Sequence, residues 1–276
     1  MDIDSIVVDI CTKEVETKRT NSNPLCILIG GLPGSGKTNL VEQIKREYQD
    51  REFVVIDTDD YRKLHPDYEE LKRTPEKAIA ETSKFSNAIE VELIRMAIER
   101  HCDIISVTTL RATDAINTIL YEPAIKQGYR MEACIMSVPV RESGLSAQSR
   151  YEIQISEGEC PRFTPMDFIE SSSKGIQATI KMLQGKEDKP LIRVYKRGIG
   201  QASMPIEVYS SADNENMYRC ALEAFLHPTN SLNKDVANEQ LQKIYNAKRK
   251  RNANVIEYSS IERLKELFGI IEEKEK

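Results

Sequence analysis

The chain of 276 residues contains no tryptophan, and aromatic residues make up only 6% of it. Aromatic platforms that stack nucleic-acid bases are therefore scarce. The net charge of −5 at pH 7 also argues against binding of nucleic acid by the whole surface. The three histidines are widely spaced and predict no metal cluster. We expect no nucleic-acid partner and no metal site built on histidine.

The sequence also lacks an apolar run that approaches the ~20 residues needed to cross a membrane. Its first twenty residues lack the basic segment that opens a secretory signal peptide. The six cysteines form no Cys-x-x-Cys pair, and Cys26, Cys102 and Cys134 lie in or beside apolar segments, which predicts buried, reduced thiols. Together these absences predict a soluble cytoplasmic protein with no membrane partner.

What the chain does have is a glycine-rich segment, LCILIGGLPGSGKTNL, at residues 25–40. Gly31, Gly36, Lys37 and Thr38 have the spacing G-x-x-x-x-G-K-[ST] of a phosphate-binding loop. Glycine permits positive φ, so backbone N–H groups can face the phosphates, and the helix that opens near Lys37 points its positive dipole end at the same anion. Lys37 can reach the β- and γ-phosphates, and the Thr38 hydroxyl can ligate Mg²⁺.

The segment therefore predicts a site for a nucleoside triphosphate, with ATP and Mg²⁺ as its ligands. The motif alone does not separate a kinase from an ATPase or a GTPase. The residues expected to bind the nucleotide are Gly31, Leu32, Pro33, Gly34, Ser35, Gly36, Lys37, Thr38 and Asn39.

Apolar runs alternate with helical patterns along most of the chain. Strands are expected at 25–30, 53–57, 103–107, 131–139 and 191–196, and helices near 37–50, 75–101, 112–127, 142–156 and 165–184. This β-α-β alternation predicts an α/β protein with the three-layer fold of P-loop NTPases and a central, mainly parallel sheet of about five strands. Residues 206–210 could add an edge strand.

The chain is expected to divide into three parts. Residues 1–24 form an N-terminal helical lead-in, 25–211 a P-loop kinase core, and 212–276 a C-terminal helical extension packed on the core. In this extension the basic run 248–251 is interpreted as a solvated helix face rather than a nucleic-acid contact. Apolar residues also share one helical face there, namely Ile261, Leu264, Leu267, Phe268 and Ile271.

Two aspartates, one the last residue of the second expected strand and one just beyond it, lie in the segment FVVIDTDDYRKLHPDY. If the extended geometry continues, Asp57 and Asp59 point to the same side, and ligands of open α/β sheets lie at this carboxyl end of the strands. One carboxylate could orient an acceptor hydroxyl, and the other could support Mg²⁺ through water. The alternative is a pair of turn-forming aspartates before a helix.

Arg150 and Arg162 are candidates for binding the phosphoryl group in flight, because guanidinium groups suit the charge on its equatorial oxygens. With Lys37 they would place three cations near the triphosphate. Only their position between the fourth and fifth strands, where P-loop kinases carry a mobile lid, distinguishes them from ordinary surface arginines.

Five blocks of the sequence resemble the zeta toxins of bacterial toxin–antitoxin systems, which are P-loop kinases that phosphorylate UDP-N-acetylglucosamine. The resemblance extends from about Leu25 to Ser211. In chain order the blocks are GGLPGSGKT, IDTDDYRKLHPDYEEL, TLRATD, IMSVPVRESGLSAQSRYE and PRFTPMDF. Five blocks in order, with family-like spacing, are far more specific than the loop alone.

This resemblance implies a kinase that transfers the γ-phosphate of ATP to the sugar 3'-hydroxyl of UDP-N-acetylglucosamine or a related sugar nucleotide. It implies that Asp59 is the catalytic base, that Lys37 and Thr38 serve the phosphates and Mg²⁺, and that Arg150 and Arg162 neutralise the transferring group. It also implies a small antitoxin protein as a partner. The candidate acceptor-binding residues are Asp57, Arg62, His65, Thr109 and Arg111.

The chain departs from the family in the third strand. Where many members have an acidic residue followed by glycine, this sequence has Val107 and Thr108. The missing carboxylate motivates an alternative hypothesis, a small-molecule kinase with a different acceptor such as a nucleotide, a dinucleotide or an antibiotic hydroxyl. A second alternative is a non-catalytic nucleotide-binding partner protein that uses the apolar stripe of the C-terminal helix as an interaction surface.

Overall fold

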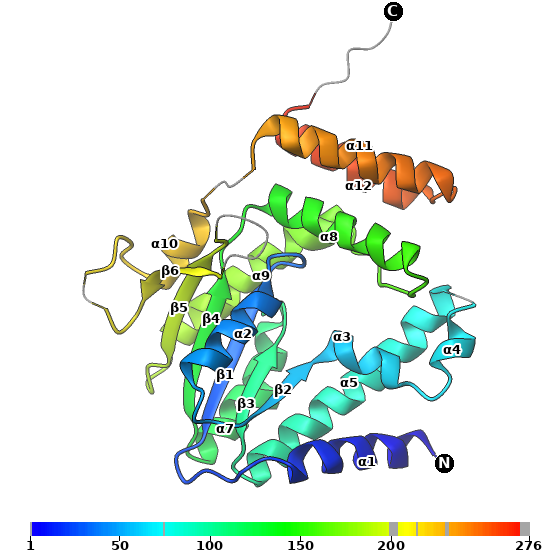
Figure 1. The fold of residues 1–276 in the computed structure, drawn as a ribbon. Coiled ribbons are helices and arrows are strands. Elements are labelled where there is room, and N and C mark those ends of the chain that lie inside the picture. Colours follow the sequence, from blue (N-terminus) through cyan, green and yellow to red (C-terminus); the bar gives the residue numbers. More distant parts are fainter. Residues whose placement is uncertain (1, 74, 199–203, 214, 230–231, 271–276) are drawn as a thin grey trace, which may run out of the picture.

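The computed structural model describes residues 2–73, 75–198, 204–213, 215–229 and 232–270. Its centre is a six-stranded sheet with the strand order β2-β3-β1-β4-β5-β6 (Figure 1). Its strands are β1 (Leu25–Gly31), β2 (Phe53–Asp57), β3 (Asp103–Val107), β4 (Arg130–Met136), β5 (Leu191–Lys196) and β6 (Ile206–Ser210). All neighbouring strands are parallel except β5 and β6. The expected mainly parallel α/β sheet is confirmed, with β6 as its antiparallel edge.

The helices lie between the strands and beyond them. They are α1 (Ile3–Glu16), α2 (Lys37–Glu47), α3 (Thr58–Tyr61), α4 (Tyr68–Leu71), α5 (Pro75–Glu99), α6 (Thr113–Ala115), α7 (Glu122–Lys126), α8 (Val140–Ser156), α9 (Met166–Gln184), α10 (Ala221–Leu226), α11 (Lys234–Lys250) and α12 (Val255–Phe268). A 3₁₀ turn, η1, covers Arg62–Leu64, and a π-helical segment, η2, covers Ile116–Tyr121. None of these helices combines the length and apolarity needed to cross a membrane.

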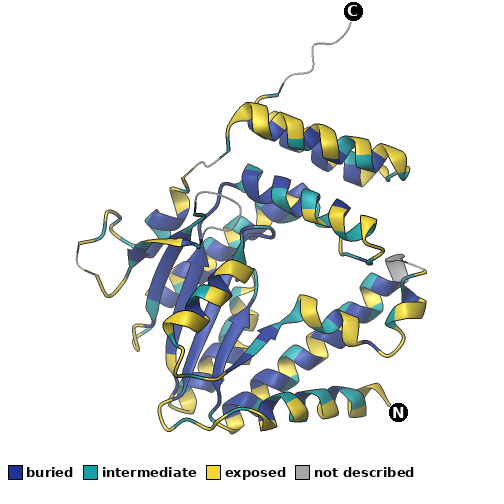
Figure 2. Ribbon diagram, in the orientation of Figure 1, coloured by how far each residue is buried: buried dark blue, intermediate teal, exposed yellow. Residues whose placement is uncertain are grey.

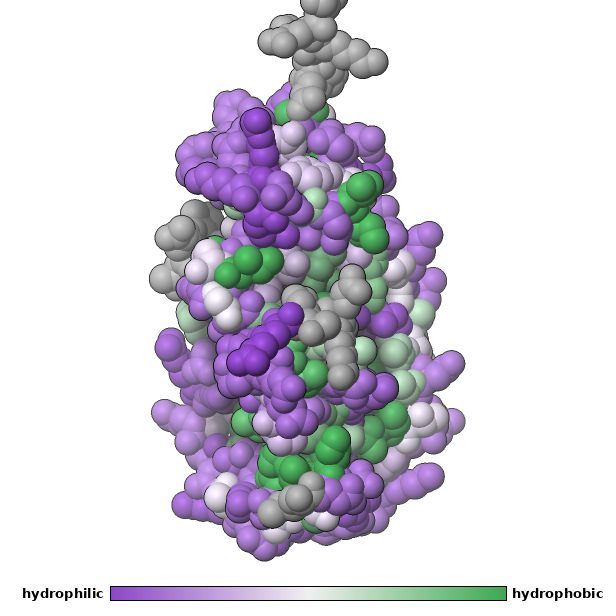
Figure 3. All heavy atoms as spheres, turned by 90° about the vertical axis from the view of Figure 1, so that its right-hand side faces the viewer, coloured by the Kyte–Doolittle hydropathy of each residue, from purple (hydrophilic) through white to green (hydrophobic). Residues whose placement is uncertain are grey.

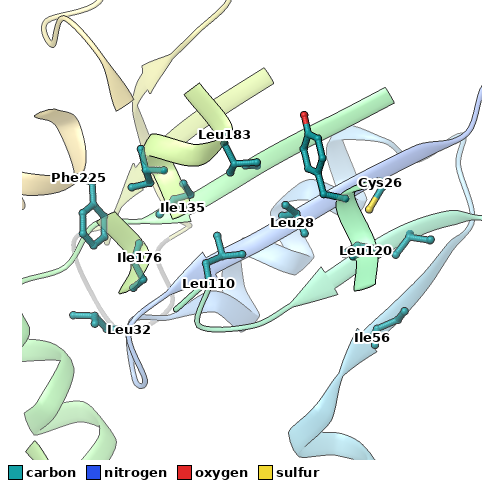
Figure 4. Packing of buried hydrophobic residues seen from close by; sticks show 14 of the residues in the cluster. Cys26, Leu28, Leu32, Ile56, Leu110, Leu120, Ile135, Ile176, Leu183 and Phe225 are labelled. Carbon is teal, nitrogen blue, oxygen red and sulfur yellow. The ribbon is translucent and has the colours of Figure 1, made fainter. Parts of the chain in front are cut away.

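Strand β1 lies in the middle of the sheet, and all seven of its residues are buried. Alternate side chains enter two different clusters. Ile27 and Ile29 pack in one cluster with residues of α2. Cys26 and Leu28 pack in a larger cluster with residues of α5 and α9, and Figure 4 shows part of this cluster, with Ile176 and Leu183 of α9. Both faces of the sheet are therefore covered, which explains why β1 reads as a continuous apolar run. Figure 2 shows the strands buried along most of their length.

The six cysteines carry free thiols, and only Cys220 is not buried. The expectation of buried, reduced Cys26, Cys102 and Cys134 is confirmed.

Two expected elements end or break differently. Strand β4 stops at Met136 rather than at 139, because Pro139 has no N–H to donate to a ladder and directly precedes α8. The helix expected at 112–127 is divided by η2 into α6, a π-helical segment and α7. The π-helical segment places Ile116 and Ile119 on the wall of a large cavity at the carboxyl ends of the strands.

The C-terminal helices α11 and α12 lie beside α8 (Figure 1). Ile261, Leu264 and Phe268 are buried in the main core, and Leu267 packs against it, while Ile271 lies outside the described residues. The hypothesis that this stripe is an exposed interaction surface is therefore wrong for the described residues, since the stripe covers α8 and α9 of its own chain.

The interpretation of the basic run 248–251 as a solvated face is also wrong in part. Arg249 and Lys250 are exposed, but Lys248 has no exposed surface. Its ammonium group lies 2.8 Å from Glu152 of α8 and 3.0 Å from Glu257 of α12, and Arg251 binds the same two carboxylates. We refer to these four residues as the ionic cluster. Burial of Lys248 is tolerated because each charge has an opposite partner.

Candidate active site

A cavity of about 1060 Å³ opens at the carboxyl ends of β1, β2 and β3. Its lining comes from the P-loop, from the segments that follow β2 and β3, from α5, and from α8 with the loop that follows it. In Figure 1 α8 lies on one side of this region and α3 to α5 on the other. Figure 3 shows the right-hand side of the molecule in Figure 1, where hydrophilic residues cover most of the surface and hydrophobic residues form separate patches. Ligands of open α/β sheets bind at this edge.

The P-loop leaves β1 through backbone that only glycine adopts readily. Gly34 and Gly36 have φ of 79° and 97°. A Cβ on Gly34 would also lie 2.6 Å from the Ser143 carbonyl oxygen and 2.8 Å from the Ala147 nitrogen, both in α8. Ser143 Oγ donates a hydrogen bond of 2.7 Å to the Pro33 carbonyl. The loop therefore packs directly against α8.

Lys37 is the first residue of α2, and its Nζ donates to the carbonyls of Gly31 and Leu32 at 3.1 and 3.2 Å. Burial lowers the pKa of Lys37 to about 8. The carboxylate of Asp57 acts against this shift, and the positive charge of Arg150 adds to it. An anion at the loop would restore the charged form, so this lysine suits a phosphate ligand.

The donor set of the loop fits Mg²⁺ bound together with a triphosphate. No group of three or more His, Cys, Asp or Glu residues within the described ranges could hold a metal ion without further ligands. Thr38 and Asp57 both line the cavity. Mg²⁺ usually binds through one or two protein oxygens with phosphate and water completing its shell.

The two aspartates reach the cavity by a route other than the expected one. The extended backbone does not continue past β2, because α3 begins at Thr58 and Asp57 accepts a hydrogen bond of 3.1 Å from the Asp59 N–H as its N-cap. The condition of continued extended geometry is therefore not met, and the alternative of aspartates at the start of a helix is observed, yet both residues line the cavity. Burial raises the pKa of Asp57 to about 6; the Asp59 N–H opposes this shift, and the charges of Asp59 and Asp60 add to it.

Arg150 and Arg162 both line the same cavity with exposed side chains. Arg150 lies close enough to Lys37 to lower its pKa. The Arg162 guanidinium lies 5.6 Å from the centre of the Phe168 ring, and that of Arg111 lies 4.6 Å from the same ring. The structure thus brings together Lys37, Asp59 and the two arginines, although these residues come from four separate segments.

Not all of the candidate acceptor-binding residues line the cavity. Thr109, Arg111 and Arg62 line the cavity. Arg62 Nε donates to Thr82 Oγ1 at 3.1 Å, while one of its terminal nitrogens is buried without a hydrogen-bond partner. His65 does not line the cavity, because its buried ring packs edge-on against Phe85 at 5.1 Å.

Three further residues contribute to the site; Glu90 and Arg197 lie outside the sequence motifs, and Phe168 is the last residue of the block PRFTPMDF. Glu90 of α5 lines the cavity, and burial together with the charge of Asp57 raises its pKa. Phe168 of α9 lies against both Arg111 and Arg162. Arg197 follows β5 and donates to the carbonyls of Gly34 and Ser35 in the P-loop and to Ser146 Oγ of α8. Glu90 and Arg197 are far in sequence from the loop, so only the fold reveals them.

Replacement of Gly175 by alanine is expected to displace the segment that carries Arg111. A Cβ on Gly175 would lie 2.5 Å from the Arg111 carbonyl oxygen and 2.8 Å from its Cα, and backbone yields less easily than a side chain. We expect the free energy of unfolding to fall by about 1–3 kcal/mol, measured by urea denaturation. Gly185→Ala is the control, since its nearest contacts are 3.5 Å. Equal stability of the two variants would contradict the close approach.

Binding of Mg-ATP is expected to weaken as the pH rises above 8. In the free protein Lys37 loses its proton near this pH, so the triphosphate must bind with uptake of a proton. The association constant should fall by up to tenfold per pH unit between pH 8 and pH 9.5, measured by calorimetry. The Lys37→Met variant should bind Mg-ATP weakly at every pH, and its association constant should show no such fall above pH 8. An unchanged affinity of the unmodified protein over this range would contradict the role of Lys37.

The comparisons with known proteins agree with this geometry. The family model described as "Zeta toxin" matches residues 10–211. The chain belongs to the zeta toxin family. Relatives of this zeta toxin family protein include "Toxin zeta" of Enterococcus hirae, 28% identical over 208 residues (74% of this chain and 72% of that protein). "Toxin zeta" of Streptococcus agalactiae is 27% identical over 241 residues (85% and 79%).

Solved structures share the fold of this zeta toxin family protein. A structure from the PezAT chromosomal toxin–antitoxin system of Streptococcus pneumoniae has a TM-score of 0.68 at 22% identity, and covers 90% of this chain and 96% of its own. A structure of AvrRxo1-ORF1:-ORF2 with ATP has a TM-score of 0.55 at 14% identity, and covers 96% and 87%. Membership and fold together support a kinase-like toxin.

Proposed function

We propose that this protein is a kinase that transfers the γ-phosphate of ATP to the sugar 3'-hydroxyl of UDP-N-acetylglucosamine or a related sugar nucleotide. The observation that carries the proposal is the convergence of Lys37, Asp59, Arg150 and Arg162 on one cavity. ATP as the donor is further supported by the solved structure of AvrRxo1-ORF1:-ORF2 with ATP. The volume of about 1060 Å³ can hold two ligands of this size.

Each residue has a role that its position allows. The loop N–H groups and Lys37 bind the β- and γ-phosphates, and Thr38 contributes its hydroxyl to Mg²⁺, which would screen the phosphate charge. Asp59, which is exposed to the cavity, orients the acceptor hydroxyl and accepts its proton late in the transfer. Arg150 and Arg162 stabilise charge on the equatorial oxygens of the phosphoryl group in flight.

We propose that the acceptor binds in the part of the cavity that carries Arg62, Glu90, Thr109 and Arg111. We propose that the unpartnered nitrogen of Arg62 and the Arg111 guanidinium bind acceptor phosphates, and that Glu90 accepts a hydrogen bond from a sugar hydroxyl. The division into a lead-in (1–24), a kinase core (25–211) and a C-terminal extension (212–276) stays a prediction.

The test is a panel of acceptors with γ-labelled ATP and purified full-length protein. The panel contains UDP-N-acetylglucosamine, its 3-deoxy analogue, UDP-glucose, a nucleoside monophosphate, a dinucleotide and an aminoglycoside. We expect label on UDP-N-acetylglucosamine and none on the 3-deoxy analogue. Label on the 3-deoxy analogue would contradict the assigned hydroxyl.

A second candidate function is transfer to another small-molecule hydroxyl. It is favoured by Val107, which is 5% exposed and lines the cavity where the family resemblance predicts a carboxylate. A clear preference in the panel for the nucleotide, the dinucleotide or the aminoglycoside would establish this candidate instead. An antitoxin partner is also proposed, because the similar structure comes from the PezAT toxin–antitoxin system.

A further inference from the structure

The ionic cluster lies behind the part of the cavity wall that carries the two arginines. Lys248 of α11 binds Glu152 of α8 and Glu257 of α12 at 2.8 and 3.0 Å. Arg251 donates from Nε to Glu152 Oε2 at 3.0 Å and from a terminal nitrogen to Glu257 Oε1 at 3.2 Å. The cluster therefore joins three helices through four charges whose sum is zero.

The cluster also contacts the two aromatic residues that follow the arginines in sequence. Lys248 Nζ lies 5.2 Å from the centre of the Tyr151 ring and 5.0 Å from that of Phe163. The two rings meet edge-to-face at 5.1 Å. Since Tyr151 follows Arg150 and Phe163 follows Arg162, one ammonium group contacts the direct neighbours of both arginines.

The arginines themselves have few contacts that could fix them. Within the described residues neither Arg150 nor Arg162 forms an ion pair, and the ring contact of Arg162 is with Phe168. Their placement therefore depends on the backbone and the neighbouring side chains. Charges that are buried and fully paired hold such neighbours more rigidly than exposed pairs do, because a misplaced partner would leave a charge without compensation.

We infer that Lys248 is a positioning residue for phosphoryl transfer, which sets Arg150 and Arg162 through Tyr151, Phe163 and the ionic cluster. The inference rests on the proposed function, because it assigns the C-terminal helices a task at the same site. In this view α11 and α12 are part of the kinase rather than an appendage. Lys248 does not line the cavity, so any effect on the site passes through the residues that it contacts.

The two carboxylates of the cluster stay ionised at neutral pH. Burial alone would raise the pKa of Glu152 and of Glu257, but the hydrogen bonds from Arg251 and Lys248 outweigh it, and both pKa values lie below the usual range. The two carboxylates are thus ionised wherever the protein is expected to work.

The experiment compares Lys248→Met with Lys250→Met in the full-length protein. Lys250 is exposed on the same helix, two residues further on, and serves as the matched control. Displacement of a transition-state contact by ~1 Å can lower a rate by ~100-fold. We expect kcat to fall ~10- to 100-fold in Lys248→Met with KM for ATP within about twofold, and no change in Lys250→Met. Hydrogen exchange of segment 150–163 should rise in Lys248→Met alone, while exchange of 25–47 stays the same.

Glu257→Gln provides a second variant in case Lys248→Met does not fold. It removes one charge of the cluster, is nearly isosteric, and lies on α12 away from the cavity. It should show the same pattern at smaller amplitude. A lower melting temperature with unchanged kcat and unchanged exchange at 150–163 would overturn the inference. If the unmodified protein transfers phosphate to no acceptor, the proposed function fails, and the exchange data still decide whether Lys248 orders this segment.

Discussion

Arg150→Met is expected to lower kcat by about 10³-fold or more, the range seen when an arginine that stabilises a transferring phosphoryl group is lost. The side chain lines the cavity and lies near Lys37, so its guanidinium can reach the γ-phosphate side of the nucleotide. In the proposed reaction, the charge that Arg150 compensates develops mostly in the transition state. The Kd for Mg-ATP should therefore change only a few-fold while kcat falls.

Single-turnover transfer of label from ATP, combined with calorimetric binding of Mg-ATP, measures both quantities. Arg249→Met is a suitable control, because Arg249 is exposed on α11 and does not line the cavity. Arg150→Lys should recover only part of the rate, since lysine keeps the charge but loses the planar fork of donors. A fall in kcat of less than tenfold in Arg150→Met would contradict the proposed role of Arg150 in stabilising the transferring phosphoryl group.

Asp59→Asn is expected to lower kcat by ~10²- to 10⁴-fold, which is the usual contribution of a positioned general base. Asparagine keeps the size of the side chain and leaves the backbone N–H that donates to Asp57 unchanged, so the start of α3 should persist. Loss of the negative charge removes the acceptor for the hydroxyl proton. Binding of Mg-ATP should be retained, because the loop and Lys37 are untouched.

The matched control is Asp50→Asn, which alters an exposed aspartate beyond the end of α2. The pair is measured with the acceptor that the panel identifies, at saturating ATP. A fall of less than ~100-fold for Asp59→Asn would count against this residue as the base. A larger fall for Asp57→Asn than for Asp59→Asn would move the assignment to the neighbouring carboxylate.

The centre of the fold was predictable from sequence because its signals are local. The apolar run of β1, the glycines of the loop and the helix that follows occupy one continuous segment, 25–47, and the structure confirms them. Asp57 was harder to place, since the sequence cannot say whether a strand continues for two residues or a helix begins. Asp57 caps the helix α3, as one of the two hypotheses predicts, and it also lines the cavity.

The C-terminal helices show what a sequence alone cannot provide. Lys248 reads as one member of an exposed basic run, and its burial depends on Glu152, which lies 96 residues away. Glu90 reaches the cavity from α5, and Arg197 reaches the P-loop from the end of β5, only through the three-dimensional fold. Such long-range pairings carry no periodicity and no motif.

The packing of α8 determines how ligands can enter. Near its start, Ser143 and Ser146 bind the P-loop and Arg197, and near its end Glu152 is held by α11 and α12. A helix fixed at both ends cannot swing outward as a rigid lid. We therefore expect the cavity to open by movement of the opposite wall, which is formed by α3 and α5, or of the loop at 157–165. Exchange of ligands at the proposed site is then governed by the wall that holds Asp59 or by the loop that holds Arg162, and not by an outward movement of α8.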